Sequence, residues 1–161
     1  MARKRVSTRA KPRRKTAAKE DASDLTLELK LVRLVESKAN LAIAGRQFPR
    51  NASVIAGVEG ANPKAVENGF ELRVRVTADI TGTADDNKGS RLEILCRYEV
   101  ISIAPREPTK DEVKRNAFAA AHIAWPYLRE FVSSVSSRMG ALPVVLPLLR
   151  VNPDEGMQLL P

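Results

Sequence analysis

The stretch FELRVRVTADI, residues 70–80, decides the fold class of this chain. Apolar side chains stand at every second position, and polar or charged side chains stand between them. This two-residue period is typical of a β-strand with one covered face and one wet face. The apolar positions are Phe70, Leu72, Val74, Val76, Ala78 and Ile80, which alternate with Glu71, Arg73, Arg75, Thr77 and Asp79.

Further strands are predicted on both sides of this stretch. The run LEILCRYEV, residues 92–100, repeats the alternation after the polar turn at residues 81–90, so the two runs predict an antiparallel pair. Upstream, alternation from Leu25 to Leu31 predicts another strand, and a slip of phase through Val32 and Leu34 indicates a bulge or a bend. Residues 45–65 are punctuated by glycine and proline, and their piece SVIAGV is either a weak edge strand or part of a long loop.

After these strands the period becomes helical. Thr109 and Glu112 form a capping box behind Pro108, and Gly140 is a plausible C-terminal cap. An apolar stripe at steps of three and four residues runs from Val113 to Met139. Pro126 falls inside this stripe, which predicts either a strong kink or the end of one helix and the start of another.

The C-terminal segment ALPVVLPLLRVNPDEGMQLLP, residues 141–161, is apolar and repeatedly interrupted by proline. This density of proline excludes a long helix and a central strand. We therefore expect an extended aliphatic segment that is either a lid on the core or part of a binding surface.

The positive charge of the chain is concentrated at its N-terminus. Residues 1–24 hold nine of the 27 basic and three of the 19 acidic residues, and so carry +6 of the net charge of +8. With hardly any apolar side chains, this tail is predicted to be disordered, and residues 25–161 to form one domain. No apolar signal region follows the basic residues, and the single cysteine fits a reducing compartment, so we expect a cytoplasmic protein.

The sequence contains no motif that indicates a catalysed reaction. His122 is the single histidine, and no second histidine or cysteine stands at ligand spacing, so neither a zinc site nor a serine triad is predicted. Cys96 is in phase with the apolar side of its strand, which favours a buried side chain over a reactive thiol. No phosphate-binding or dinucleotide motif is present. We expect no enzyme activity, no cofactor and no metal.

The block FAAAHIAWPYLREFVSSVSSRMGALPVVLPLLRVNPD, residues 118–154, resembles the corresponding block of the SecB export chaperone and its SecB-like relatives. An aromatic-Pro-Tyr-x-Arg-Glu core, a serine-rich stretch ending in Arg and Gly, and a proline-punctuated apolar run are shared with that family. The matching positions are Pro126, Tyr127, Arg129, Glu130, Ser133, Ser137, Arg138, Gly140, Pro143, Leu146 and Pro147.

The resemblance implies an α+β fold, with a four-stranded antiparallel sheet and a long C-terminal helix on one face. It also implies a homotetramer, a dimer of dimers stacked through that helix, which holds non-native polypeptides unfolded without ATP. The helix residues expected at the oligomer interface are Ala121, Ala124, Leu128, Val132 and Val135. The residues expected to contact a client are Val54, Ile55, Trp125, Val145, Leu146, Leu148 and Leu149, each of which is equally compatible with ordinary core packing.

Departures from the family leave the partner open. The export chaperone docks the SecA motor on acidic outer strand positions, whereas Arg73, Arg75 and Arg97 stand at such positions here, so SecA binding is doubtful. SecB-like proteins also act as dedicated chaperones of antitoxins, which makes preproteins and an antitoxin the two candidate clients. A different class of function is a nucleic-acid-associated or ribosome-associated protein, whose basic tail at residues 1–24 contacts RNA phosphates.

Overall fold

The computed structural model describes residues 25–43, 51–83, 90–141, 143–152 and 156–160. Its main sheet is formed by β1 (Glu28–Ala42), β2 (Asn51–Gly60), β3 (Lys64–Val66), β4 (Gly69–Thr83) and β5 (Arg91–Ala104). One helix, α1 (Lys110–Arg138), follows, and β6 (Leu148–Asn152) and β7 (Gly156–Leu160) close the described chain. The predicted basic tail lies outside the described residues.

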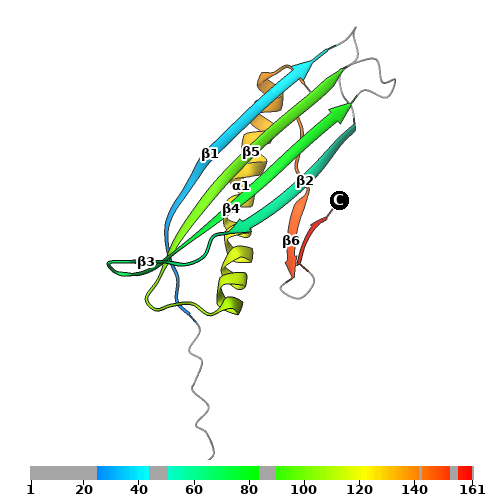
Figure 1. The fold of residues 1–161 in the computed structure, drawn as a ribbon. Coiled ribbons are helices and arrows are strands. Elements are labelled where there is room, and N and C mark those ends of the chain that lie inside the picture. The colour runs from blue at the N-terminus through cyan, green and yellow to red at the C-terminus, as the bar shows by residue number, and fades with distance from the viewer. Residues whose placement is uncertain (1–24, 44–50, 84–89, 142, 153–155, 161) are drawn as a thin grey trace, which may run out of the picture.

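The sheet is antiparallel, with the strand order β1-β5-β4-β2, and the short β3 pairs with the beginning of β4. Figure 1 shows α1 crossing behind the four long strands, so one face of the sheet is covered by the helix and the other is open. The predicted α+β class, with four principal strands and a C-terminal helix on one face, is confirmed.

The two clearest alternating runs form the centre of the sheet. Val74 pairs with Val100, Ala78 with Cys96 and Ile80 with Ile94, and because directly paired residues share a face, all of these side chains point towards α1. Cys96 is fully buried there, as its phase predicted. The core between the sheet and the helix is almost wholly aliphatic, with the small Ala120, Ala121 and Ala124 on the helix side.

β1 contains two bulges, at the register shifts between Leu29 and Leu31 and between Leu34 and Glu36. The first bulge moves Leu31 to the open face, where it pairs with Ile101, so the predicted alternation from Leu25 to Leu31 along one face is wrong at its last position. An extra residue reverses the facing of every side chain that follows it. The phase slip read from the sequence is therefore real, but it begins one residue earlier.

The SVIAGV piece is an edge strand, which decides between the two alternatives left open by the sequence: it forms most of β2 and pairs with β4. The chain then turns back through β3 into β4 at Gly69, whose φ is 134°. A Cβ atom at this position would lie 2.1 Å from the carbonyl oxygen of Ala104, so only glycine fits the turn.

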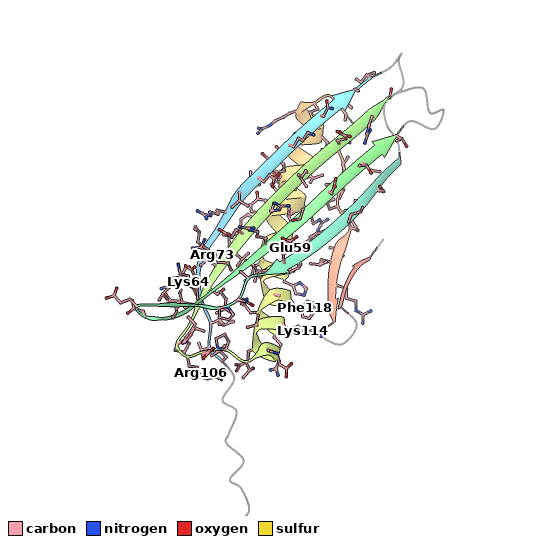
Figure 2. The ribbon with its side chains drawn as sticks, in the orientation of Figure 1. Glu59, Lys64, Arg73, Arg106, Lys114 and Phe118 are labelled. Atoms are coloured by element: carbon pink, nitrogen blue, oxygen red, sulfur yellow. The ribbon has the colours of Figure 1, made fainter. Side chains whose placement is uncertain are left out.

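The helix begins and ends where its caps were predicted. The Thr109 hydroxyl accepts a hydrogen bond from the Glu112 amide, and the Glu112 carboxylate accepts one from the Thr109 amide, which completes the capping box. Gly140, with a φ of 77°, follows the C-cap residue Met139 and donates its amide to the Ser137 carbonyl. Lys114 lies over the Phe118 ring on the first turns of this helix, at 5.8 Å from the ring centroid (Figure 2).

Of the two alternatives at Pro126, the end of one helix and the start of another is wrong, because α1 continues through this residue. Pro126 is exposed, while the neighbouring Ala124, Trp125 and Leu128 are buried. The carbonyl that loses its amide partner belongs to the exposed His122, so water can satisfy it. A proline on the wet side of an amphipathic helix therefore costs the helix less than one facing the core.

Candidate functional site

The C-terminal segment is fixed to the helix at three points. The Leu146 side chain is fully buried in the core. The Trp125 indole nitrogen donates a 2.9 Å hydrogen bond to the Pro147 carbonyl, and the Val144 amide donates a 2.9 Å hydrogen bond to the Ser136 hydroxyl. Because proline leaves residues 143–147 without a regular hydrogen-bonding partner strand, side chains of α1 supply the partners instead.

Apolar side chains on this anchored segment also face the solvent. Val145 is 67% exposed and Leu148 is 58% exposed, whereas Val144 and Leu149 are partly buried against the core. β6 and β7 then form a two-stranded sheet of their own, which Figure 1 shows on the β2 side of the molecule. The segment therefore places a short row of aliphatic side chains at the surface on a fixed backbone.

The two predicted contact residues of β2 lie on opposite faces of the sheet. Val54 pairs with Ile80 on the helix side and is partly buried, while Ile55 pairs with Asp79 on the open side and is 70% exposed. The predicted set is thus divided into three groups. Val145 and Leu148 are both exposed on the C-terminal segment, and Ile55 is exposed on the open face of the sheet. Trp125 and Leu146 lie in the core, and Val54 and Leu149 are partly buried against it.

The helix residues predicted at an oligomer interface face the sheet. Ala121, Ala124, Leu128 and Val132 are fully buried within the subunit, and Val135 is partly buried against the same core. Helical periodicity identified the covered side of α1 but could not tell a sheet of the same chain from a second subunit. The other side of α1, which carries His122, Pro126, Tyr127 and Glu130, is exposed.

An apolar surface on β1 was not anticipated from the sequence. Four side chains of this edge strand are between 39% and 48% exposed: Leu29, Leu31, Leu34 and Val35. The Tyr127 ring lies 5.9 Å from the Tyr98 ring, which pairs with Leu34 across β1 and β5. The broken alternation of β1 was the sequence signal that could have indicated this surface, because bulges distribute the leucines of the strand over both faces of the sheet.

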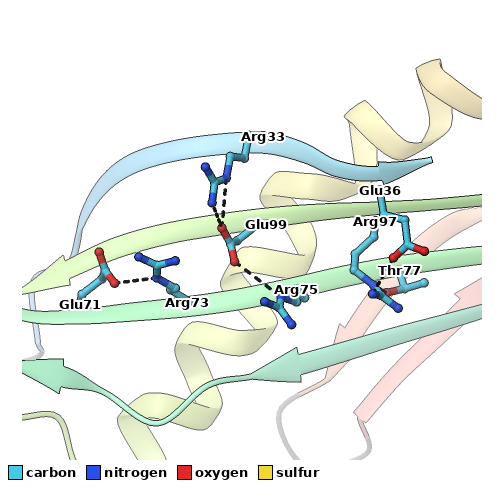
Figure 3. Close-up of polar contacts among 8 residues, drawn as sticks. All are labelled: Arg33, Glu36, Glu71, Arg73, Arg75, Thr77, Arg97 and Glu99. Atoms are coloured by element: carbon cyan, nitrogen blue, oxygen red, sulfur yellow. Dashed lines mark hydrogen bonds and ion pairs between the residues drawn. The ribbon is translucent and has the colours of Figure 1, made fainter.

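The open face of the sheet carries a network of arginines, each next to a carboxylate (Figure 3). Arg33 and Arg75 flank Glu99 at 2.7 Å and 3.6 Å, while Arg73 pairs with Glu71 and Arg97 with Glu36. Glu99 is almost completely buried under the arginine stems. Burial raises the pKa of Glu99, but the hydrogen bond from Arg33 and the charges of the arginines outweigh it and hold this pKa below its ordinary value. The face is therefore charged but internally balanced.

Groups for catalysis or metal binding are not gathered in the described part of the chain. Burial raises the pKa of the Cys96 thiol to about 12, so it stays protonated and unreactive at neutral pH. His122 is exposed on the helix surface. Across the described ranges, no cluster of histidine, cysteine, aspartate or glutamate has an arrangement that could hold a metal ion. No helix in the same part of the chain is long and apolar enough to cross a bilayer.

Comparison with known proteins gives a likeness of fold. No family model matches the chain, and no curated protein matches it. A SecB-like chaperone of Mycobacterium tuberculosis, solved in complex with a ChAD peptide from the HigA1 antitoxin, is similar with a TM-score of 0.61 and 17% sequence identity, over 78% of this chain and 92% of that one. A protein of unknown function from Streptococcus agalactiae matches with a TM-score of 0.39 and 12% identity, over 77% of this chain and 98% of that one.

The likeness to the mycobacterial chaperone shows a SecB-like fold over 78% of this chain, as the resemblance of the 118–154 block implied. At 17% identity it carries no more than the fold. What this fold does in the present chain must therefore be argued from its own surfaces.

Proposed function

We propose that this protein is an ATP-independent holding chaperone that binds non-native polypeptides through exposed aliphatic side chains. The observation that carries this proposal is the C-terminal segment, where Leu146, Trp125 and Ser136 fix a backbone on which Val145 and Leu148 remain exposed. Exposed apolar side chains on a fixed backbone are typical of an interaction surface. An apolar surface without an arrangement of polar groups accepts many sequences.

The client is a polypeptide, and two sources remain in the proposal: a preprotein on its way to export, or an antitoxin. The SecB-like fold is shared with a chaperone that was solved with an antitoxin peptide, which supports the second source. Delivery to SecA is not part of the proposal, because Arg33, Arg73, Arg75 and Arg97 replace an acidic docking face with balanced ion pairs. The assembly proposed is the homotetramer expected for this fold.

The test is suppression of aggregation without nucleotide. An unrelated protein is diluted from guanidinium into buffer that contains the full-length chain, and light scattering is followed. We expect suppression by the wild type, and several-fold weaker suppression by the double variant Val145→Ser/Leu148→Ser, since both side chains are exposed and their loss leaves the core intact. Val66→Ser, which removes an exposed valine from β3, is the matched control and should behave as wild type.

The same assay separates the chaperone from the nucleic-acid hypothesis. A chain that lacks residues 1–24 keeps every residue named in the proposed surface, so its suppression should equal that of the full chain. If the full chain suppressed aggregation and the chain without residues 1–24 did not, the activity would be assigned to the basic tail. Absence of suppression by both forms, with the fold intact by circular dichroism, would contradict a general holding function.

A further inference from the structure

A small pocket lies on the first turns of α1, whose later residues Trp125 and Ser136 anchor the C-terminal segment. It has a volume of about 190 Å³ and is lined by Leu25, Leu27, Glu112, Arg115, Asn116 and Ala119. The four helix residues are spaced by three and four positions, so they share one side of α1. Leu25 and Leu27 belong to the segment that leads into β1, which Figure 1 shows running past the first turns of the helix.

The distinctive residue of this pocket is Asn116. Only 5% of its surface is exposed, yet its side-chain amide has no hydrogen-bond partner among the residues that the structure describes. In the described part of the chain, every side-chain nitrogen or oxygen that is sealed from solvent has a hydrogen-bond partner. The Asn116 amide must therefore reach solvent through an opening, and the pocket is the opening that this residue lines. Because its amide reaches solvent there and bonds no described residue, its donors and its acceptor are available to a ligand that enters the pocket.

The two charged residues of the lining are already engaged. The Glu112 carboxylate receives hydrogen bonds from the Arg106 guanidinium at 2.7 Å and 3.0 Å and from the Thr109 amide at 2.8 Å. Arg115 takes part in an interaction of its own. What remains for a ligand is an apolar hollow formed by Leu25, Leu27 and Ala119, with one neutral amide in its wall. These features disfavour a charged metabolite.

We propose that this pocket binds one aliphatic side chain of an extended polypeptide, and that the Asn116 amide pairs with the adjoining peptide group. The volume is below the roughly 300–1,000 Å³ of pockets that enclose whole small molecules, and it suits a single side chain. An asparagine amide offers both donors and an acceptor, which match the carbonyl and the amide of one peptide bond. The polypeptide is the client of the proposed function, on which this inference rests, and the pocket adds a contact on the first turns of α1, separate from the segment that Trp125 and Ser136 anchor.

The test uses acetyl-Gly-Leu-Gly-amide as the probe and nitrogen-15 spectra of the full chain as the readout. We expect saturable shifts of the Asn116 side-chain amide signals, and at least about fivefold weaker binding of acetyl-Gly-Ser-Gly-amide, because the hollow is apolar. Asn116→Leu should weaken the leucyl peptide at least about fivefold through the lost hydrogen bonds. Ala119→Phe, at an exposed position that lines the pocket, should abolish binding, whereas Ser137→Phe at the other end of α1 should not.

The outcomes are distinct from those of the aggregation assay. Shifts at Asn116 that Ala119→Phe removes would support the pocket even if wild-type protein suppressed no aggregation, in which case the proposed function alone would fail. Suppression of aggregation without shifts at Asn116 would overturn the pocket proposal alone. Shifts that appear only after deletion of residues 1–24 would identify the chain's own N-terminal segment as the occupant and would also overturn it.

Discussion

At the level of single residues, Val145 and Leu146 are adjacent and have opposite environments. Leu146 is fully buried, whereas Val145 is 67% exposed. We expect Leu146→Ala to lower the free energy of unfolding by about 2–5 kcal/mol, through lost burial and the cavity that remains. Val145→Ala, its matched control, should change it by less than about 0.5 kcal/mol. Urea unfolding followed by Trp125 fluorescence measures both, and equal effects would mean that the segment is not anchored through Leu146.

Glu112 makes the stability of the helix start depend on pH. The Arg106 hydrogen bond, followed by the Thr109 backbone, lowers the pKa of Glu112 from 4.5 to about 2. Figure 2 shows Arg106 on the loop before α1. Because this pKa is lowered by folding, the carboxylate contributes its full stability above about pH 4.5 and loses it as the pH falls towards 2.

Glu112→Gln isolates this contribution, since glutamine keeps the capping geometry and does not ionise. We expect the wild type to be more stable than the variant at pH 7, and the difference to shrink steadily between pH 4.5 and pH 2. Thermal unfolding midpoints at several pH values measure it. Glu99 is present in both proteins, so its own titration cancels from the comparison. A difference that does not change with pH would contradict the role of the Glu112 charge.

At the level of elements, Pro126 is the test of how α1 stays continuous. A proline inside a helix costs about 3 kcal/mol where nothing compensates, and the exposed side of α1 offers water to the freed His122 carbonyl. We expect Pro126→Ala to raise the free energy of unfolding by about 1–3 kcal/mol, measured by urea unfolding. Pro143→Ala, at an exposed position outside the helix, should give no such gain. A loss of stability in Pro126→Ala would mean that the packing of Trp125 and Leu128 depends on the proline.

The elements that could be predicted from the sequence are those in which local pattern and burial agree. The alternation from Leu72 to Ile80 and the Thr109 capping box need no knowledge of distant residues, and both are confirmed. The course of α1 through Pro126 and the facing of Leu31 depend on which side meets water and on where a bulge occurs. These are set by tertiary packing, which a single sequence does not display.

From the sequence, the candidate site could be recognised only by the composition of its segment, which is aliphatic and rich in proline. The proline-punctuated aliphatic run marked the C-terminal segment, but its pattern could not tell the buried Leu146 from the exposed Val145 and Leu148. That distinction comes from the hydrogen bonds of Trp125 and Ser136, whose partners are 22 and 8 residues further along the chain and which local pattern does not reveal. Asn116 gave no signal at all, because a polar residue on a helix is ordinarily solvated.

At the level of the whole molecule, β1 is an edge that the described chain leaves open. It pairs with β5 on one side, and among the described strands nothing pairs with its other side. Natural proteins protect long edges with charges, prolines or a covering element. The two bulges of β1 protect its edge in part, but the exposed Leu29, Leu31, Leu34 and Val35 add apolar surface to it. A second copy of the chain is the simplest cover for such a strand, since it brings an identical edge.

We therefore expect the protein to be an oligomer whose assembly depends on β1 rather than on the buried side of α1. Sedimentation of the wild type should give a mass at least twice the 17.7 kDa of the chain. The double variant Leu31→Lys/Leu34→Lys should shift it to the monomer with its circular dichroism retained, because both side chains are already 39–41% exposed and a lysine there opposes edge pairing. Leu148→Lys, at an equally apolar exposed position away from β1, should leave the mass unchanged.

A wild type that sediments as a monomer would contradict the assembly. An oligomer that persists in the double variant would instead assign the contact to the exposed side of α1 around Tyr127.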